Sequence, residues 1–477
     1  MITWSNVVGD GLKSELDGLE SPRSILARRT EAMKALTTSL IRNLSSRSGV
    51  AATVHTLLAN VLILGLNVLT GIITARILGP GGRGEQAAII LWPQFLAYTL
   101  TLGLPSALLY NLKRYPDQAS RLFSAALLLA TFMGGVATVV GVLFIPYWLP
   151  DDYSPAVVRF AQLCMLISPV ALLGVVLTAA LQAREEFTLY NAARYLQPLL
   201  TLLALVLLAA THHLTPFTAA LSYLLPGVPV LLWLVARLWR LYRPNWQGVS
   251  PAFRRLTSYG LRSYGADLAG TLANQLDRVL VVGFLNPVAM GLYVVAFSLS
   301  RTLHIFQASV VPVLFPKAAG RSTEAVVALT GRAARVSLAV TALPGAGLLV
   351  LGPWVLNLIY GSEYLGAVPL VRILVVEAMV SATTSILVQA FMAVDRPGVV
   401  TILQSIGVGI TVSLLLVLVA RYGLKGAAFA LLISALAQLT FAYLSFPLVL
   451  KARPPRLWLS RAEILGWTRR RSSDESS

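Results

Sequence analysis

Apolar runs long enough to cross a bilayer recur about every 25 to 40 residues along almost all of this 477-residue chain. A helix needs about 20 mainly apolar residues to span the hydrocarbon, and inside it the backbone has to hydrogen-bond to itself. Only 12% of the residues are charged, about half of the share in soluble domains. The pattern therefore predicts an all-α polytopic membrane protein.

Twelve runs have the length and composition of a transmembrane helix. We predict them at 54–78, 86–111, 122–146, 158–182, 190–210, 216–239, 258–284, 288–313, 326–350, 365–392, 398–420 and 425–450.

Basic residues concentrate on one side of these helices. The two tails, the connections after even-numbered helices and the helix ends next to these connections hold 30 of the 38 Lys and Arg residues. Because cytoplasmic loops are enriched in Lys and Arg, we expect both termini in the cytosol, which requires an even number of spans. The net charge of +18 is thus explained by topology. Nucleic acid is not expected as a partner, since the charges form short clusters and no single patch.

A weak internal repeat divides the predicted helices into two groups of six. A shift of 207 residues places Asn67 on Asn274, Pro80 on Pro287 and Gly84 on Gly291. Such a parallel repeat is typical of transporters, and chance similarity among apolar helices is the alternative. The predicted organisation is a cytosolic tail at 1–53, a first six-helix lobe at 54–240, a cytosolic linker at 241–257, a second lobe at 258–450 and a basic cytosolic tail at 451–477.

The N-terminal tail contains a candidate amphipathic helix at 21–47, with basic residues beside Ile25, Leu36 and other apolar side chains. Plain disorder is the alternative. Met1 and Met33 are both candidate start sites.

Several predicted helices carry a polar face. Ionisable side chains in a span are costly, and they usually face the bundle interior or a water-filled cavity. The seventh helix has polar residues at three- and four-residue steps, which places them on one face, and the first, second and eighth helices carry similar stripes. Bonding between helices for packing is the alternative reading. The candidate substrate-binding residues are Asn60, Asn67, Gln94, Asp267, Thr271, Asn274, Arg278, Arg301 and His304.

Two carboxylates in the spans are candidates for ion coupling. Asp267 lies on the polar face of the seventh helix, and Glu377 lies near the middle of the tenth. Because the bilayer penalises charge, a carboxylate there is suited to binding and releasing a proton. A structural pairing with a neighbouring helix is the alternative.

No motif of catalysis or cofactor binding occurs. The chain has no P-loop, HExxH, CxxC or nucleophile-elbow pattern, and its one cysteine is Cys164. The glycines at 79, 81 and 84 match a dinucleotide pattern, but they follow a predicted transmembrane helix where the motif requires a strand. We expect no catalytic residue, metal or cofactor. Short predicted outer loops also weigh against a membrane glycan polymerase.

Two segments resemble a known family. The stretch TARILGPGGRGEQA, at 74–87, resembles the first loop of bacterial lipid-linked oligosaccharide and polysaccharide flippases. These form the polysaccharide transporter family of the multidrug, oligosaccharidyl-lipid and polysaccharide exporter (MOP) superfamily. The stretch NQLDRVLVVGFLNPVAMGLYVVA, at 274–296, is similar to the seventh-to-eighth helix region of that family.

The resemblance implies two facing lobes around a cationic cavity, in the bacterial cytoplasmic membrane. Its substrates would be polyprenyl-pyrophosphate-linked glycans for O-antigen, capsule or exopolysaccharide, with membrane lipids and the polymerase and glycosyltransferases of the same pathway as partners. The cavities of that family use basic residues for the pyrophosphate, and the resemblance would assign this role here to Arg278 and Arg301. The first lobe departs from the pattern, because the polar stripe of its first two helices carries no charge.

Two other transporters are alternatives. A cation-coupled multidrug exporter of the superfamily would be expected to carry an acidic residue in its first helix, and none occurs between His55 and Ala75. A lipid II flippase is a closer variant. The sequence leaves open the glycan, the coupling ion and the oligomeric state.

Overall fold

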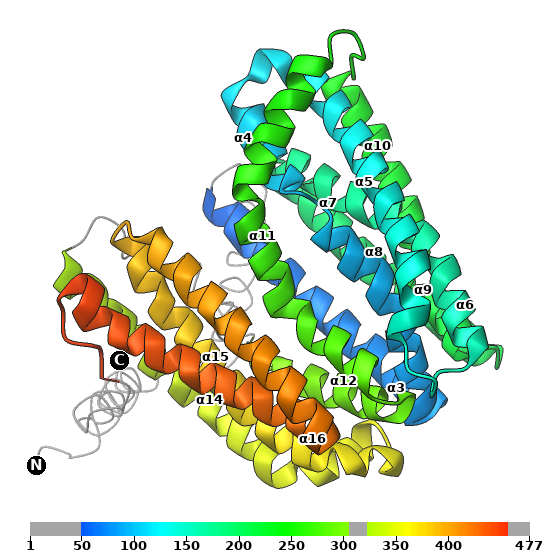
Figure 1. The fold of residues 1–477 in the computed structure, drawn as a ribbon, viewed down its shortest axis with the longest axis vertical. Coiled ribbons are helices and arrows are strands. Elements are labelled where there is room, and N and C mark those ends of the chain that lie inside the picture. The colour runs from blue at the N-terminus through cyan, green and yellow to red at the C-terminus, as the bar shows by residue number, and fades with distance from the viewer. Residues whose placement is uncertain (1–48, 305–321, 457–477) are drawn as a thin grey trace, which may run out of the picture. The chain divides into compact units, whose positions relative to one another are not determined.

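The computed structural model describes residues 49–304 and 322–456. The chain divides into two compact units, Met1–Ala59 and Asn60–Ser477, and the contacts below all lie within the second. Every regular element in the described ranges is a helix (Figure 1), which confirms the predicted all-α class. The candidate amphipathic helix at 21–47 lies outside those ranges.

The first lobe, blue to green in Figure 1, contains the helices up to the connection before Ser250. Its elements are α3 (Gly49–Thr99), α4 (Leu104–Arg114), η1 (Pro116–Gln118), α5 (Ala119–Trp148), α6 (Pro155–Cys164), η2 (Met165–Ile167), α7 (Ser168–Ala183), α8 (Phe187–Ala210), α9 (Pro216–Leu224) and α10 (Gly227–Tyr242).

The second lobe, green to red in Figure 1, follows. Its described elements are α11 (Ser250–Phe284), α12 (Pro287–Arg301), α14 (Thr323–Ile359), η3 (Ser362–Ala367), α15 (Val368–Ala393), α16 (Pro397–Ser445) and the π-helical turn η4 (Phe446–Leu450).

The helices account for twelve spans. Eight helical segments among the described residues are long and apolar enough to cross a membrane. Two of them, in α3 and α16, are each two helices joined at a kink, at Gly79 with φ +64° and at Gly423 with φ +56°. Glycine adopts this left-handed conformation without a steric penalty, so each kink separates two spans and the eight segments supply ten. The polar α11 and the 15-residue α12 lie at the positions of the other two predicted spans, so the described helices agree with a count of twelve.

Helix boundaries differ from the prediction at the connection between the lobes. The seventh helix begins at Ser250, inside the stretch 241–257 that the sequence indicated as a linker. Pro251 lies in its first turn, where a missing N–H is harmless and a fixed φ favours the helix. The proline therefore starts the helix here and does not mark a loop.

Three predicted spans are also interrupted. The second breaks at Leu102 and Gly103, both with positive φ, so α4 is a separate helix. The fourth contains the 3₁₀ turn η2 just before Pro169, and the sixth breaks around Pro226. Proline cannot donate to the preceding turn of a helix, so it interrupts the ladder of hydrogen bonds there. Apolar length alone does not reveal these breaks.

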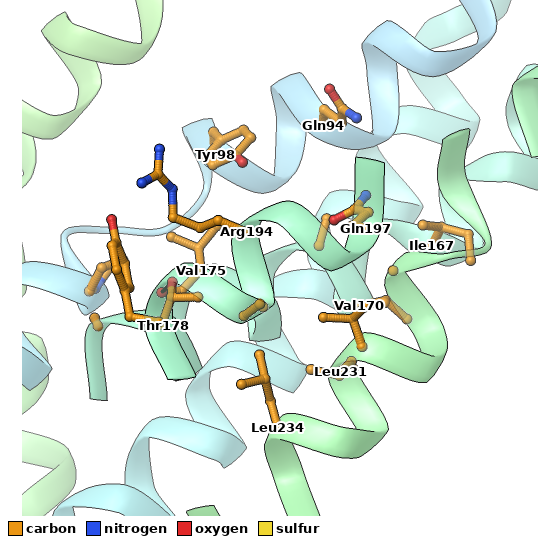
Figure 2. Close-up of a pocket in the computed structure, with 18 of the residues that line it drawn as sticks. Gln94, Tyr98, Ile167, Val170, Val175, Thr178, Arg194, Gln197, Leu231 and Leu234 are labelled. Atoms are coloured by element: carbon orange, nitrogen blue, oxygen red, sulfur yellow. Dashed lines mark hydrogen bonds between the residues drawn. The ribbon is translucent and has the colours of Figure 1, made fainter. Parts of the chain in front are cut away.

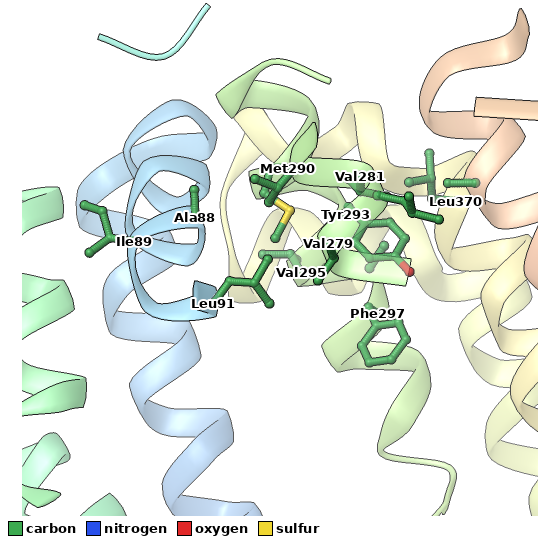
Figure 3. Close-up of a cluster of buried hydrophobic side chains, with 14 of the residues drawn as sticks. Ala88, Ile89, Leu91, Val279, Val281, Met290, Tyr293, Val295, Phe297 and Leu370 are labelled. Atoms are coloured by element: carbon green, nitrogen blue, oxygen red, sulfur yellow. The ribbon is translucent and has the colours of Figure 1, made fainter. Parts of the chain in front are cut away.

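Buried side chains of α3 pack against α11 and α12. Leu91 of α3 belongs to the same buried cluster as Val279 of α11 and Met290 and Val295 of α12 (Figure 3). Trp148 of α5 adds a polar contact, since its Nε1 donates to the carbonyl of Val279 at 3.0 Å. The first lobe therefore contacts the first two helices of the second through both apolar and hydrogen-bonded groups.

Two glycines related by the 207-residue shift form a reciprocal contact. A Cβ atom on Gly84 would lie 1.7 Å from the carbonyl oxygen of Pro287, and one on Gly291 would lie 1.9 Å from that of Pro80. No side chain fits at such distances, so backbone meets backbone. The contact joins the two segments that carry the family resemblance, and its symmetry supports the repeat.

The last helix of each lobe ends in a similar way. Arg243 after α10 and Lys451 after η4 are basic residues with positive φ, 45° and 51°. The Arg243 carbonyl accepts a hydrogen bond from Ser120 in α5, and the Arg456 carbonyl accepts one from Arg335 in α14. In each lobe, the segment after the sixth span thus returns to the third span.

We predict that Gly84→Ala and Gly291→Ala each lower the melting temperature of the detergent-solubilised protein. The added methyl group has to displace backbone, and overpacking of this kind costs about 1–3 kcal/mol. Because the two contacts form one interface, the melting temperature of the double variant should fall by less than the sum of the falls in the two single variants. Gly135→Ala is the control, since nothing lies within 4 Å of its added Cβ. Additive losses, or no loss, would contradict a shared contact.

Candidate functional site

A cavity of about 580 Å³ lies among helices of the first lobe (Figure 2). Gln94 and Tyr98 come from α3, Arg194 and Gln197 from α8, and Leu231 is among the apolar residues of α7 and α10 that complete the wall. Many of its polar groups are neutral amides and hydroxyls, which can both donate and accept hydrogen bonds. Of the predicted site residues, Gln94 lines this cavity.

Arg194 brings a positive charge to the cavity of the first lobe. Its guanidinium carbon lies 5.3 Å from the ring centroid of Tyr190, one turn earlier on α8. Counting basic residues by connection assigned Arg194 to the cytosolic connection before the fifth helix. The structure adds this side chain to the lining of the first-lobe cavity. The signal in the sequence was the stripe Tyr190, Arg194 and Gln197, with the helical spacing of four and three residues.

The predicted polar face of α11 meets the first lobe beside this cavity. Ser106, which also lines the cavity, donates to both carboxylate oxygens of Asp267, at 3.0 and 3.3 Å. Tyr264 Oη donates to the Thr99 carbonyl at 2.7 Å, and Thr271 Oγ1 donates to the Asp267 carbonyl at 3.0 Å. Asp267 is thus bound to the opposite lobe.

A second group of charges lies between α11, α12 and α15. The guanidinium carbons of Arg278 and Arg301 lie 4.8 and 4.6 Å from the ring centroid of Phe297, so both cations contact one buried ring. Two like charges around one ring repel each other, and the aromatic ring offsets part of that cost. The two guanidinium groups thus share one aromatic partner.

Glu377 lies beside this arginine pair. Its side chain is 5% exposed, and its Oε1 lies 3.9 Å from Arg301 Nη2 and accepts a hydrogen bond from Ser381 Oγ at 2.8 Å. Arg301 Nη1 also lies 3.2 Å from His304 Nε2. The structure therefore brings together Arg278, Arg301, His304 and Glu377. Glu377 has the structural partner that the sequence left open as an alternative to ion coupling.

Asp277 belongs to the same group and was not among the predicted residues. It is 5% exposed, and its Oδ2 accepts a 2.6 Å hydrogen bond from Tyr293 Oη. Its position next to Arg278 and one turn after Asn274 in the sequence was the available signal.

Other predicted residues lie elsewhere. Asn60 is half-buried and Asn67 is exposed, and neither is among the described residues that line the cavity. The side chain of Asn274 lies outside the described part of the structure. No cluster of three or more His, Cys, Asp and Glu side chains that could hold a metal occurs within the described ranges.

Comparison with known proteins gives a family match over most of the chain. A sequence model of a family described as polysaccharide biosynthesis proteins matches residues 73–369. The probable low-salt glycan biosynthesis flippase Agl15 of Haloferax volcanii is 24% identical over 223 residues, which are 45% of this chain. The chain matches 46% of the length of that relative.

Solved structures share the fold. The lipid II flippase MurJ, in an inward closed conformation, superposes with a TM-score of 0.70 and 14% identity over 85% of this chain and 88% of that one. An inward-facing multidrug resistance MATE family transporter of the MOP superfamily gives 0.62 and 15%, over 82% and 96%. At these identities the likeness establishes the fold, which is that of MOP-superfamily transporters.

We predict that Tyr293→Phe lowers the free energy of unfolding by about 1–3 kcal/mol, because the buried Asp277 carboxylate loses its hydroxyl donor. Thermal unfolding in detergent measures the change. Tyr422→Phe is the control, since that ring is 64% exposed. In a double-mutant cycle with Asp277→Asn, the two losses should be coupled. Independent, additive losses would show that the hydrogen bond contributes nothing.

Proposed function

The chain belongs to the polysaccharide biosynthesis protein family, and from that premise we propose that it is a flippase for lipid-linked oligosaccharide. It is a multi-pass membrane protein with the fold of MOP-superfamily transporters. In the proposed cycle, the glycan and pyrophosphate head enters between the lobes from the cytosol while the polyprenyl chain stays in the bilayer. The lobes then rock to expose the head outside, for O-antigen, capsule or exopolysaccharide synthesis.

The observation that supports this proposal is the presence of arginines within the helices of both lobes. Arg194 lines the cavity of the first lobe, and Arg278 and Arg301 flank Phe297 in the second. A guanidinium group offers planar, paired donors that match phosphate oxygens, and it stays charged at any physiological pH. Three such groups in a membrane protein suit a pyrophosphate better than an uncharged or cationic solute.

The neutral lining of the first-lobe cavity suits the sugar part of the same ligand. Gln94, Thr178 and Gln197 offer amide and hydroxyl groups, and Tyr98 adds an aromatic surface. Sugars present hydroxyl groups that both donate and accept hydrogen bonds, so such a lining binds them without a net charge. The name of the archaeal relative, a probable glycan biosynthesis flippase, agrees with this assignment.

The proposed orientation gives the reciprocal glycine contact a role. With both termini in the cytosol, Gly84 and Gly291 belong to the outer end of the lobes. The first-lobe residues Ala75 and Arg76 add contacts near this end, since Tyr364 Oη donates to the Ala75 carbonyl at 3.1 Å and Arg76 Nε donates to the Ile359 carbonyl at 2.7 Å. These bonds have to open before a head group can leave.

Arg194→Ala, Arg278→Ala and Arg301→Ala should each cause lipid-linked glycan to accumulate on the cytosolic leaflet. Loss of one charge-assisted phosphate contact costs roughly 1.5–3 kcal/mol, so we expect a fall in export of about tenfold or more. Leaflet-specific labelling of the glycan in cells that depend on this protein measures the effect.

Arg372→Ala is the matched control, because this arginine lies in α15 of the second lobe but is exposed and bonds only the Leu349 carbonyl among the contacts described. Cells with this variant should export the lipid-linked glycan at the unchanged rate. Normal export in all three test variants would refute the site. Resistance to toxic cations on expression would instead indicate a multidrug exporter, and rescue of lipid II export would indicate a lipid II flippase.

A further inference from the structure

A second basic pocket lies away from the proposed transport site. Its volume is about 590 Å³, and it lies between the first turns of α14 and the segment that follows η4. Its charged lining residues are Glu324, Arg332, Arg335, Lys451, Arg453 and Arg456. Five cations and one anion give this lining a net charge of +4.

The segment 451–456 is held against α14. Lys451 turns the chain back with φ +51°, and Pro455 is buried against Gly331, whose added Cβ would lie 2.6 Å from the Pro455 Cβ. Arg335 Nη1 donates to the Arg456 carbonyl at 2.8 Å. These contacts place the cations of the segment around the pocket, while Arg453 and Arg456 stay exposed to a ligand.

The pocket lies where two membrane spans end on the same side. One wall is the start of the span Thr323–Ile359, and the other follows directly after the span that ends at Leu450. An apolar cluster that includes Val326, Val327 and Phe446 lies next to it, and Val327 also lines the pocket. By this assignment of the spans, the cations lie where the hydrocarbon would meet the head groups.

We propose that this pocket binds the phosphate head group of an anionic phospholipid. Basic pockets between transmembrane helices attract such head groups, and each Lys or Arg near an anionic membrane surface adds to the attraction. The location at the ends of two spans favours a lipid over a soluble phosphate, because the acyl chains can remain in the bilayer beside the apolar cluster. The bound lipid would link α14 to the segment after η4.

The proposed lipid pocket does not depend on what the protein transports, and its role would be to attach the segment after η4 to its lobe. In the first lobe, the segment after α10 continues into α11, which packs on α4 and α5. In the second lobe, the described segment is attached to α14 through Pro455 and Arg335. A bridging head group would add ionic contacts to this attachment, so lipid binding should stabilise the second lobe.

The test uses the full-length protein in a neutral detergent. We expect dioleoylphosphatidylglycerol to raise the melting temperature and to remain bound in native mass spectrometry, whereas dioleoylphosphatidylcholine does neither. The variant Arg332→Gln/Arg453→Gln/Arg456→Gln should bind phosphatidylglycerol roughly tenfold to a hundredfold more weakly. Arg335 is kept, since it holds the segment in place.

A matched control removes the same charge elsewhere. Arg237→Gln/Arg240→Gln/Arg254→Gln neutralises three exposed arginines, two near the end of α10 and one near the start of α11, and it should keep the lipid effect. The melting temperatures without lipid show whether each variant is folded. An equal lipid effect in both triple variants would overturn the site, and so would an equal effect of inorganic phosphate, which would indicate a soluble ligand.

Discussion

Hydrocarbon offers a polar group no water, so each one inside the bilayer needs a partner within the protein. This requirement makes every regular element among the described residues a helix, and the breaks within the spans lie at particular residues, such as Gly103 and Pro226. It also directs the polar side chains of α11 and α12 inward. Asp267 is bonded to Ser106 of the first lobe, and Arg301 lies beside Glu377. The interior of the protein therefore replaces the solvent that the bilayer excludes.

The sequence predicted the transmembrane spans well, because each span depends only on the length and apolar composition of its own segment. About 20 apolar residues cross a bilayer wherever they occur. The predicted helix boundaries were wrong at prolines, because a proline can either start a helix or interrupt one. Pro251 was assigned to the linker, although it lies in the first turn of α11. Pro169 and Pro226 were placed inside continuous helices, but each of these helices is interrupted near its proline.

The site was predictable only as far as one helix determines it. The spacing of Asp267 and Arg278 along α11 follows from helix geometry, but their partners depend on which helices pack together. No pattern indicated that Arg278 and Arg301 contact the same ring, or that Asp277 accepts a hydrogen bond from Tyr293. Arg194 was missed for another reason, since counting charges by loop assumes that a residue near the end of a span faces bulk water.

The reciprocal contact of Gly84 and Gly291 has the form of an isologous interface, in which residue i meets j and residue j meets i. Two identical copies of a single six-helix half could form the same contact about a two-fold axis. In such a dimer the two halves have the same sequence, so a charged residue introduced by mutation would be present in both halves. A chain that contains both halves is free of that constraint, and its lobes differ accordingly: one brings Arg194 on its fifth span, and the other brings Arg278 and Arg301 on its first two. Two lobes on one chain can thus present different side chains within a symmetric scaffold.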